Sequence, residues 1–277
     1  MQQDMLYREP VIHRSGELPL KIYKTHHVTY HWHDEYEFLL SDEDDVHCTV
    51  SGQQIILNRG DTLIIQGGRL HSLSMSMGRS ITAIVVHPRL WSGDLACRPL
   101  DGLEFTSLFT HGSTLGEKIH GILNRVKNCY DARLPCCEFL LRSHFCSLFA
   151  LLLEEGEYRE STADQRGLSS GEAALFDYVH RHLGDALSLD TLCARSHYSK
   201  SYVIRLFKKN TGQTPTEYIN SCRIELAKEL LKTKSVTETA LECGFNNLSY
   251  FCKVFRRCTG ETPRRWNREP LAFTNCR

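Results

Sequence analysis

The sequence predicts an α+β chain of more than one domain, in which a β-rich N-terminal part is followed by helices and an all-helical C-terminal part. Short β-branched or apolar runs between turn-forming residues fill roughly the first hundred positions. From Gly116 onward the apolar residues recur at helical spacing instead. A repeat at an offset of 48 residues then indicates one helical unit built twice. A chain of 277 residues is long enough for two such domains, each with its own core.

The β-rich part, residues 1–110, reads as an antiparallel barrel or jelly roll. Several short strands at close spacing are typical of these folds. The expected strands are Val46–Val50, Gln54–Leu57, Thr62–Ile65 and Ile81–Val86. The turn formers between them are Ser51-Gly52, Asn58–Asp61 and Gly67-Gly68. We expect the acidic stretch Asp42–Asp45 to be a solvated hairpin loop, and Met1–Lys24 to be an N-terminal arm.

Two helices are expected next, in a segment from residue 111 to 155. One apolar stripe runs along the first helix: Ile119, Ile122, Leu123, Val126 and Tyr130. The second helix, Cys136–Glu154, ends in the block Leu148–Leu153, which is more apolar than one buried stripe requires. That block either packs under the barrel or forms a subunit interface, so we assign 111–155 to linking and dimerisation. Residues 156–170 are polar, lack periodicity and are expected to be a linker.

The repeat relates Phe207–Tyr218 to Phe255–Trp266, and Ser201 and Tyr202 recur upstream as Ser249 and Tyr250. Two copies are too few to bury the stacked core of a solenoid. Two tandem helical units, each with a basic pair in the same place, instead suggest a double grip on a regular polymer such as DNA.

The net charge of zero conceals an asymmetry between the two parts of the chain. Residues 171–277 carry 17 Lys and Arg against 11 Asp and Glu, which leaves 16 against 22 for residues 1–170. Such an asymmetry is typical of a nucleic-acid-binding part joined to another domain.

Basic residues of the second part lie on the outward faces of two predicted helices. In Lys200–Asn210, Ser199 is the expected N-cap and Gly212 follows the end, while Val203, Leu206 and Phe207 share the packed face. In Leu248–Cys258, the packed residues are Phe251, Val254 and Phe255. Neither outward face carries an acidic residue, as a groove lined by phosphates requires.

Residues 171–268 resemble the DNA-binding domain of AraC/XylS-type transcription regulators. The resemblance is carried by Ala240–Phe245, Tyr250-Phe251 and Phe255–Pro263, and it implies two helix-turn-helix motifs joined by a long helix. It implies that the base-facing residues are Ser201, Ile204 and Arg205, then Leu248, Ser249, Tyr250, Cys252 and Lys253. The expected phosphate partners are Lys208, Lys209, Arg256 and Arg257. Tyr218 and Trp266 would be core residues that close each motif rather than stacking platforms.

The N-terminal part has a second constellation, His31, His33 and Glu37 with a distant His71. On one continuous strand the first three would point to the same face. The spacing resembles the two cupin motifs, with Gln66 where that family has proline. In AraC-type regulators a cupin-like domain holds a small effector without a metal. The four residues therefore line an effector pocket or bind a divalent metal, and no other cofactor is expected.

Together these observations predict a ligand-responsive, sequence-specific transcription regulator of a sugar or small-metabolite operon. Its expected partners are double-stranded DNA, a small effector such as a sugar, a second copy of the chain and, for an activator, RNA polymerase. The alternative is a metal-dependent cupin enzyme with a DNA-binding regulatory tail. An RNA-binding module is not favoured, because the sequence lacks the stacking aromatic residues that such a module carries on an exposed sheet.

The remaining features concern the compartment. No apolar run approaches the roughly 20 residues of a membrane helix, and the start lacks a signal-peptide pattern, so we expect a cytoplasmic protein without a membrane partner. The twelve cysteines lack paired spacing, which favours reduced, mostly buried thiols.

Overall fold

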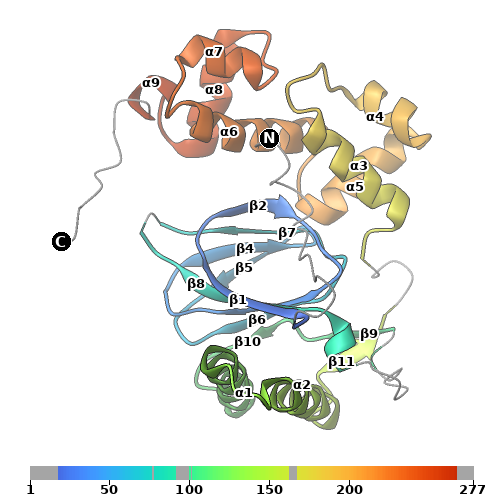
Figure 1. Cartoon of the computed structure of the whole chain (residues 1–277). Coiled ribbons are helices and arrows are strands. Elements are labelled where there is room, and N and C mark those ends of the chain that lie inside the picture. Colours follow the sequence, from blue (N-terminus) through green and yellow to red (C-terminus); the bar gives the residue numbers. More distant parts are fainter. Residues whose placement is uncertain (1–17, 77, 92–99, 101, 162–166, 267–277) are drawn as a thin grey trace, which may run out of the picture. The chain divides into compact units, whose positions relative to one another are not determined.

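The chain divides into two compact units, residues 1–169 and 170–277 (Figure 1). A computed structural model describes residues 18–76, 78–91, 100, 102–161 and 167–266. In these ranges the first unit contains the strands with helices α1 and α2, and the second unit is helical. None of the helices in the described ranges is both long enough and apolar enough to traverse a lipid bilayer.

The strands of the first unit form separate antiparallel sheets. The five-stranded sheet has the order β1 (Leu20–Thr25), β8 (Ile81–Val86), β3 (Tyr36–Leu40), β6 (Thr62–Ile65) and β10 (Leu108–Phe109). The four-stranded sheet has the order β2 (Val28–His31), β7 (His71–Ser74), β4 (Val46–Val50) and β5 (Gln53–Leu57). A two-stranded sheet pairs β9 (Leu103–Phe105) with β11 (Tyr158–Glu160). The β-rich prediction is confirmed, whereas the described strands do not close into one barrel.

Residues of the five-stranded sheet alternate between two cores. Leu39 and Ala83 pack with Cys48 and Leu73 of the four-stranded sheet, so the two sheets share an interior. Their strand neighbours, including Phe38, pack instead with α1 and α2. Because both faces are covered, every residue of β6 and β8 is buried. These strands are therefore continuous apolar runs in the sequence, and their ends could be predicted from it.

The hairpin between β4 and β5 is also as predicted. Val50 pairs with Gln53 across the two-residue turn Ser51-Gly52. Both turn residues have positive φ, 46° and 78°. This backbone matches the twist of the flanking strands and suits glycine at the second position.

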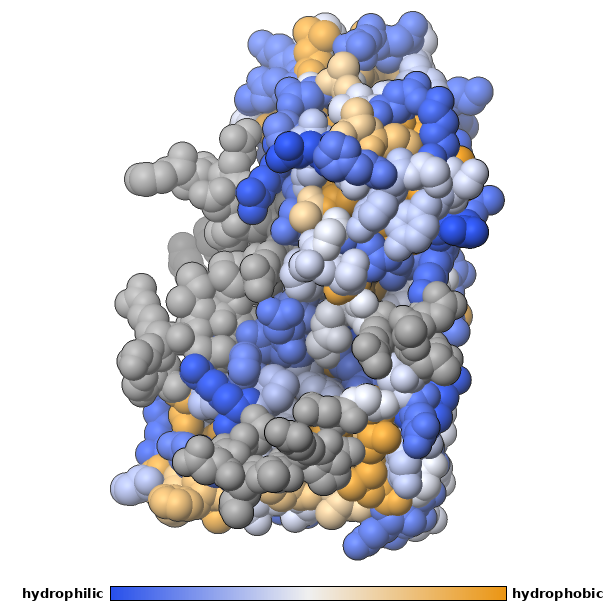
Figure 2. Space-filling view, turned by 90° about the vertical axis from the view of Figure 1, so that its right-hand side faces the viewer, coloured by the Kyte–Doolittle hydropathy of each residue, from blue (hydrophilic) through white to orange (hydrophobic). Residues whose placement is uncertain are grey.

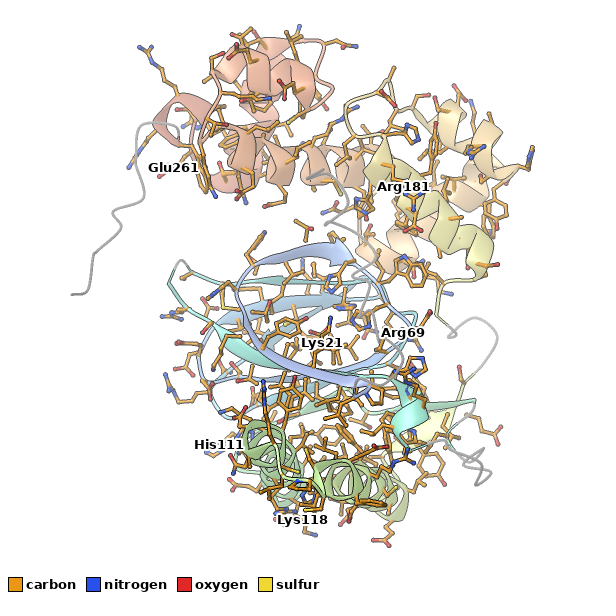
Figure 3. The ribbon with its side chains drawn as sticks, in the orientation of Figure 1. Lys21, Arg69, His111, Lys118, Arg181 and Glu261 are labelled. Carbon is orange, nitrogen blue, oxygen red and sulfur yellow. The ribbon has the colours of Figure 1, made fainter. Side chains whose placement is uncertain are left out.

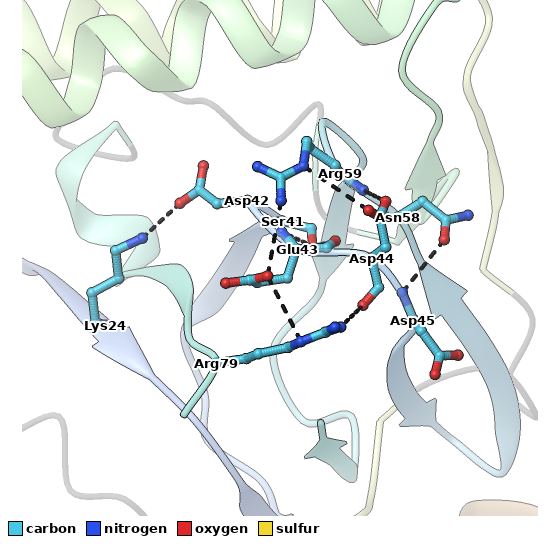
Figure 4. Close-up of polar contacts among 9 residues, drawn as sticks. All are labelled: Lys24, Ser41, Asp42, Glu43, Asp44, Asp45, Asn58, Arg59 and Arg79. Atoms are coloured by element: carbon cyan, nitrogen blue, oxygen red, sulfur yellow. Dashed lines mark hydrogen bonds and ion pairs between the residues drawn. The ribbon is translucent and has the colours of Figure 1, made fainter. Parts of the chain in front are cut away.

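The acidic stretch Asp42–Asp45 is not a hairpin loop, because it joins β3 of one sheet to β4 of the other. It is exposed but linked to neighbouring segments by ion pairs (Figure 4). Asp42 Oδ2 lies 2.6 Å from Lys24 Nζ, and Glu43 Oε2 lies 3.9 Å from both Arg59 Nη2 and Arg79 Nε. Exposed pairs of this kind contribute little individually.

Two predicted irregular segments contain strands. Residues 20–24 of the expected N-terminal arm belong to β1, which pairs with β8 from Leu20↔Val86 to Thr25↔Ile81; residues 1–17 lie outside the described ranges. Residues 158–160 of the expected linker form β11, which pairs with β9. Partners more than 50 residues away leave no local pattern, so these strands could not be read from nearby sequence.

The helices α1 (Thr114–Ala132) and α2 (Cys137–Glu154) follow the prediction closely. The short 3-10 helix η1 (Pro88–Leu90) leads into Trp91, whose ring lies 5.5 Å from Phe145 and 4.8 Å from Phe149. Within the apolar block of α2, Leu148, Phe149 and Leu152 are buried in the same core. Packing under the sheet therefore accounts for that block.

Exposed apolar side chains lie near the start of α2 instead. Phe139 is 78% exposed, Leu134 50% and Leu140 38%. Apolar side chains gather at the lower end of the view in Figure 2, where α1 and α2 lie. This apolar face of α2 is a candidate contact surface.

Two glycines of α1 should respond in opposite ways to alanine. A Cβ on buried Gly116 would lie 2.2 Å from Thr110 O, whereas a Cβ on Gly121 would meet nothing closer than 3.9 Å. Gly116→Ala should lower the free energy of unfolding by roughly 1–3 kcal/mol through overpacking. Gly121→Ala should raise it by up to about 1 kcal/mol, since alanine has the higher helix propensity. Urea unfolding of both variants measures the two signs, and equal effects would contradict the close approach at Gly116.

The second unit contains seven helices in the described residues. They are α3 (Ser170–Arg181), α4 (Leu189–Ser196), α5 (Lys200–Thr211), α6 (Pro215–Leu230), α7 (Val236–Glu242), α8 (Leu248–Thr259) and α9 (Pro263–Trp266). Ser199 caps α5 through Tyr202 N, and Gly212 ends it in the left-handed region, as predicted. Thr214 and Glu217 form a capping box at the start of α6. The helix α4 starts at Leu189 with Ser188 as its cap.

The long helix α6 lies between the two repeats and is joined to the loop after α3. Arg223 is buried and donates from Nε to Leu183 O (2.9 Å) and from Nη2 to Asp185 O (2.7 Å). Its guanidinium also lies over the Phe245 ring, 5.5 Å from the centroid. A single side chain thus ties elements of both helical repeats to α6.

All ten cysteines in the described residues are free thiols, but only five are buried. Cys137 is buried and the adjacent Cys136 is exposed, because consecutive helical residues face different directions. The expectation of mostly buried thiols therefore holds for half of them. Burial raises the pKa of Cys222 and of Cys243 to about 12.

Candidate nucleic-acid interface and histidine cluster

The helix α5 is held by an aromatic core beneath it. Val203, Leu206 and Phe207 are buried, as the spacing predicts. The Phe207 ring lies 4.5 Å from Phe176 and 5.3 Å from Tyr218. The opposite face of α5 is thereby fixed toward solvent.

That outward face carries the predicted residues of the first motif. Ser201, Arg205, Lys208 and Lys209 are exposed, and Ile204 is half-buried. The Arg205 guanidinium lies over the Tyr202 ring, 5.9 Å from its centroid. The Tyr202 hydroxyl donates to Glu172 Oε1 (2.7 Å), and this bond raises the pKa of Tyr202 to about 12. The Arg205 side chain is therefore exposed and lies beside an aromatic ring that is itself hydrogen-bonded.

The helix α8 repeats this arrangement. Phe251, Val254 and Phe255 are buried beneath it. The outward residues are Leu248, Ser249, Tyr250, Lys253, Arg256 and Arg257, which are exposed, and Cys252, which is half-buried. Asn220 Nδ2 of α6 donates to the Tyr250 hydroxyl (2.9 Å), which orients that ring. The structure thus brings all predicted residues of the second motif to one helix surface.

The basic pairs of the two motifs share a neighbour. Capping bonds from Thr214 lower the pKa of Glu217, and the charges of Arg257 and Lys208 lower it further. One carboxylate at the start of α6 therefore feels the charge of a basic residue from each motif.

Tyr218 and Trp266 close the cores of the motifs, as the resemblance implies. Tyr218 is fully buried, and its hydroxyl lies 2.6 Å from His180 Nε2. Trp266 packs edge-on against Phe255, with ring centroids 5.9 Å apart. The buried Tyr218 ring has no free face for base stacking, and the half-buried Trp266 ring has Lys228 Nζ 5.7 Å from its centroid.

The four residues of the N-terminal constellation converge, although not from one strand. The strand β2 ends at His31, His33 lies in the following connection, Glu37 is on β3, and His71 begins β7. The one continuous strand on which the first three would share a face is therefore not formed. Pairing of His31 with His71 and folding of the connection bring them together instead. One ligand atom from each residue lies within 4.8 Å of all the others, and all four residues are buried.

The three imidazoles of this histidine cluster (His31, His33 and His71, with Glu37) share one hydrogen-bonding pattern. Each Nδ1 lies at hydrogen-bond distance from a backbone carbonyl two residues away: Thr29 (3.0 Å), Glu35 (3.1 Å) and Arg69 (2.7 Å). The Nε2 atoms of His71 and His33 lie 2.8 and 3.3 Å from Glu37 Oε2. The His31 ring is 4.0 Å from that of His71.

Burial dominates the electrostatics of the cluster. It lowers the pKa of His31 to about 3, assisted by His71. Burial opposes ionisation of Glu37, but hydrogen bonds from His33 and His71 hold the pKa of its carboxyl well below the usual value. Burial likewise opposes the charge on His33, whose pKa is nevertheless raised by Glu37. Burial and the charge of Glu37 raise the pKa of Cys48 to about 12, so that thiol stays protonated.

Gln66, which replaces the proline of the cupin pattern, has its own structural role. Its Nε2 donates to Leu103 O (3.0 Å), and its Oε1 accepts from Phe105 N (3.0 Å). The side-chain amide thus pairs with the backbone of β9 as a neighbouring peptide would. Sequence reasoning missed this contact, because the strand β9 has no readable pattern.

The two glycines after Gln66 pack closely against other segments. A Cβ on Gly67 would lie 2.3 Å from Asp34 O. Gly68, at φ +75°, donates from its N–H to His33 O (2.7 Å) and accepts at its carbonyl from Leu168 N (3.0 Å). A chain of charges runs beside this turn: Arg69 (Figure 3) donates to Glu104 (3.0 Å), which also accepts from Arg159 Nε (2.9 Å).

Comparison with known proteins gives a consistent result. Residues 192–269 match the family described as a helix-turn-helix domain. The uncharacterised HTH-type transcriptional regulator YdeC of Bacillus subtilis (strain 168) is 25% identical over 94% of this chain and 95% of its own length. An HTH-type transcriptional regulator encoded in the cgkA 5′ region of Pseudoalteromonas carrageenovora is 37% identical over 42% of this chain and 70% of its own length. Among solved structures, the DNA-binding domain of AdpA in complex with a target DNA is 31% identical over 36% of this chain and 91% of that domain, with a TM-score of 0.35.

These sequence relatives are transcription regulators, not enzymes, which removes the alternative of a cupin enzyme with a regulatory tail. The second of them combines more than 30% identity with coverage of more than two thirds of its length. With its β-rich first unit and the two matched helical motifs of its second, the chain belongs to the AraC/XylS family of DNA-binding, helix-turn-helix transcription regulators.

Proposed function

We propose that this regulator reads a specific DNA sequence with α5 and α8 and that a small ligand bound in the first unit controls its activity. In the proposal, Ser201, Ile204 and Arg205 face bases in one major groove. The base-facing residues of the second motif are Leu248, Ser249, Tyr250, Cys252 and Lys253. The phosphate contacts are Lys208, Lys209, Arg256 and Arg257.

The acid-free outward faces of α5 and α8 carry the proposal. Neither helix contains Asp or Glu, and each ends in a basic pair, Lys208-Lys209 and Arg256-Arg257. Exposed helices of soluble proteins usually mix both signs. Here two helices at the same position of a repeat carry only basic charges. Such helices are suited to bind a surface lined by phosphates.

The outward residues near the helix starts differ between the motifs and would carry the specificity. Arg205 and Lys253 occupy the same repeat position, and both can donate to guanine O6 and N7. Their neighbours Ile204 and Cys252 differ, so the two half-sites would not be identical.

Selection of bound duplexes from a random DNA pool, using the full chain, tests the DNA-binding part. We expect two short conserved blocks about 10 base pairs apart, since one helix enters each successive major groove. Affinity should fall steeply with salt, by about one unit of log–log slope for each phosphate contact. Recovery of no preferred sequence would contradict base recognition by these faces.

The regulated operon would be one for the use of a sugar or another small metabolite, as the resemblance implies. The protein would act in the cytoplasm. The ligand would bind at His31, His33, Glu37 and His71, which are buried and have ligand atoms within 4.8 Å of one another. If the regulator activates transcription, RNA polymerase is a further partner.

We also propose a homodimer formed through the apolar face of α2. Phe139 is 78% exposed in the single chain and would be buried in the proposed dimer. Phe139→Lys should therefore convert the dimer to a monomer, because it would bury a charge in the interface. Light scattering at micromolar concentration measures the mass of each species. The matched control is Gln54→Lys on exposed β5, which should remain dimeric. A wild-type monomer would overturn the dimer.

A further inference from the structure

We propose that Glu172 and Asn220 are positioning residues for DNA recognition, because each fixes the hydrogen bond of an equivalent tyrosine on α5 or α8. In the first motif Glu172 holds the hydroxyl proton of Tyr202, whose ring supports Arg205. In the second motif Asn220 leaves the hydroxyl proton of Tyr250 available to the duplex. These roles rest on the proposed function above, since they concern how the two helices read DNA.

The two tyrosines and their partners belong to the repeat. Tyr202 and Tyr250 lie 48 positions apart, and so do Glu172 and Asn220. Each tyrosine hydroxyl is hydrogen-bonded to the residue 30 positions earlier in the chain. Glu172 lies on α3 and Asn220 on α6, the helices that precede the two motifs. The same pair is thus present twice, with a carboxylate in one copy and an amide in the other.

The carboxylate and the amide direct the two hydroxyl protons differently. An ionised carboxylate only accepts hydrogen bonds, whereas the NH₂ group of an amide donates them. The Tyr202 hydroxyl donates to Glu172 Oε1 (2.7 Å), so its proton is used within the second unit. Asn220 Nδ2 donates to the Tyr250 hydroxyl (2.9 Å), so that hydroxyl retains its own proton. The equivalent tyrosines therefore differ in what they offer to DNA.

Tyr202 is positioned to act through Arg205. Its side chain is half-buried, and its ring lies 4.6 Å from the Tyr198 ring. The Arg205 guanidinium lies over the Tyr202 ring, 5.9 Å from the centroid, which is within the range of a cation–π contact. A ring that is held at its hydroxyl restricts the orientations of the guanidinium before DNA binds. Less side-chain entropy is then lost when Arg205 bonds to a base.

Tyr250 is exposed, whereas its partner is buried. The Tyr250 side chain is 46% exposed on α8, and Asn220 is only 4% exposed. The Tyr250 ring also lies 6.1 Å from the ring of buried Phe245, so ring packing and the Asn220 bond together restrict its orientation. An exposed hydroxyl held by a buried donor can give its proton to an acceptor on the duplex, a phosphate oxygen or a base edge. Tyr250 is therefore the contact residue, and Asn220 acts through it.

Removal of each hydroxyl tests the two roles. Tyr202→Phe and Tyr250→Phe keep the rings, and each should weaken binding of the full chain to the selected duplex about 2- to 10-fold, as for one lost hydrogen bond. In an Arg205→Ala background the loss from Tyr202→Phe should disappear, because Tyr202 acts through that arginine. The loss from Tyr250→Phe should remain. Fluorescence anisotropy at a fixed salt concentration measures all of these affinities.

The pattern of the losses identifies the groups involved. The loss from Tyr202→Phe should be confined to the base pair that Arg205 reads, and competition with single-base variants of the duplex measures this. For Tyr250→Phe, an equal loss on all duplexes assigns the acceptor to a phosphate oxygen, and a loss at one base pair assigns it to a base.

The two partners are tested in the same way. Glu172→Ala should reproduce the loss seen in Tyr202→Phe. Asn220→Ala should likewise reproduce the loss seen in Tyr250→Phe. Combining each partner variant with its tyrosine variant should add less than about twofold, since both remove the same bond. Glu229→Ala, which removes an exposed carboxylate from α6, controls for charge and should bind as the wild type does.

Several results would overturn the assigned roles while the wild type still selects a preferred duplex. These are wild-type affinity in either tyrosine variant, a Tyr202→Phe loss that persists undiminished in the Arg205→Ala background, and additive losses from a partner and its tyrosine. A wild type that selects no duplex would instead overturn the proposed function, and the two roles with it.

Discussion

Replacing Arg205 by alanine should weaken specific DNA binding by about 1–3 kcal/mol, or roughly 5- to 150-fold in Kd, while the fold stays intact. The side chain is exposed on α5, and its guanidinium lies over the Tyr202 ring, 5.9 Å from the centroid. Its removal should therefore take away the proposed base contact without opening a cavity. The loss should be confined to one base-pair position of the selected site, at which all four bases would then be bound about equally.

Two controls separate base recognition from charge. Lys208→Ala on the same helix should weaken binding to all sequences about equally and reduce the salt slope by about one. Lys232→Ala removes a charge from an exposed position after α6 and should change neither quantity. Competition titrations with single-base variants of the site provide the comparison. A uniform loss in Arg205→Ala would assign that residue to phosphate contact instead.

Replacing Phe255 by alanine should lower the free energy of unfolding of the second unit by about 3–5 kcal/mol. Phe255 is completely buried and packs against Phe251 (5.7 Å between centroids) and Trp266 (5.9 Å). A domain is stable by roughly 5–15 kcal/mol, so this single cavity would remove a large part of that margin. Thermal and urea unfolding of the full chain measure the change.

Leu248 on the same helix is the matched control. Its side chain is 44% exposed, so Leu248→Ala should change stability by less than about 0.5 kcal/mol. It should still alter DNA binding if the residue contacts a base. Equal destabilisation by both variants would show that α8 packs differently from the arrangement described.

The helical unit could be read closely from sequence because its signals are local. Ser199, Gly212 and Pro215 mark helix ends within a few residues of the groups they satisfy. The three-and-four spacing of Val203, Leu206 and Phe207 identifies the packed face without reference to any partner.

The strands were most predictable where both faces of the sheet are buried, because such strands are apolar at every position. The strands β6 and β8 are covered on both sides, so their apolar runs show where they begin and end. The strand β11 is exposed along its whole length and pairs with residues more than 50 positions earlier. Nothing in its own three residues distinguishes it from a linker.

The sequence names the four residues of the histidine cluster, but it does not show the contacts that bring them together. His31, His33 and Glu37 would share a face on one continuous strand, but the strand β2 ends at His31. What unites them is the pairing of His31 with His71 and the close fit of Gly67 against Asp34, both of which involve residues distant in sequence. A motif can thus name the participants of a site while leaving their geometry to tertiary contacts.

The turn at Gly68 gives the first unit a short backbone route to the start of the second. The N–H of Gly68 is bonded to the carbonyl of His33, and its own carbonyl is bonded to the N–H of Leu168. Leu168 stands two residues before α3, a chain length of about 7 Å at most. Two hydrogen bonds in series therefore join the backbone of His33 to residue 168, at the C-terminal end of the first unit. A side chain at Gly68 would break this route, since its Cβ would lie 3.3 Å from Gly167 on a backbone that already has positive φ.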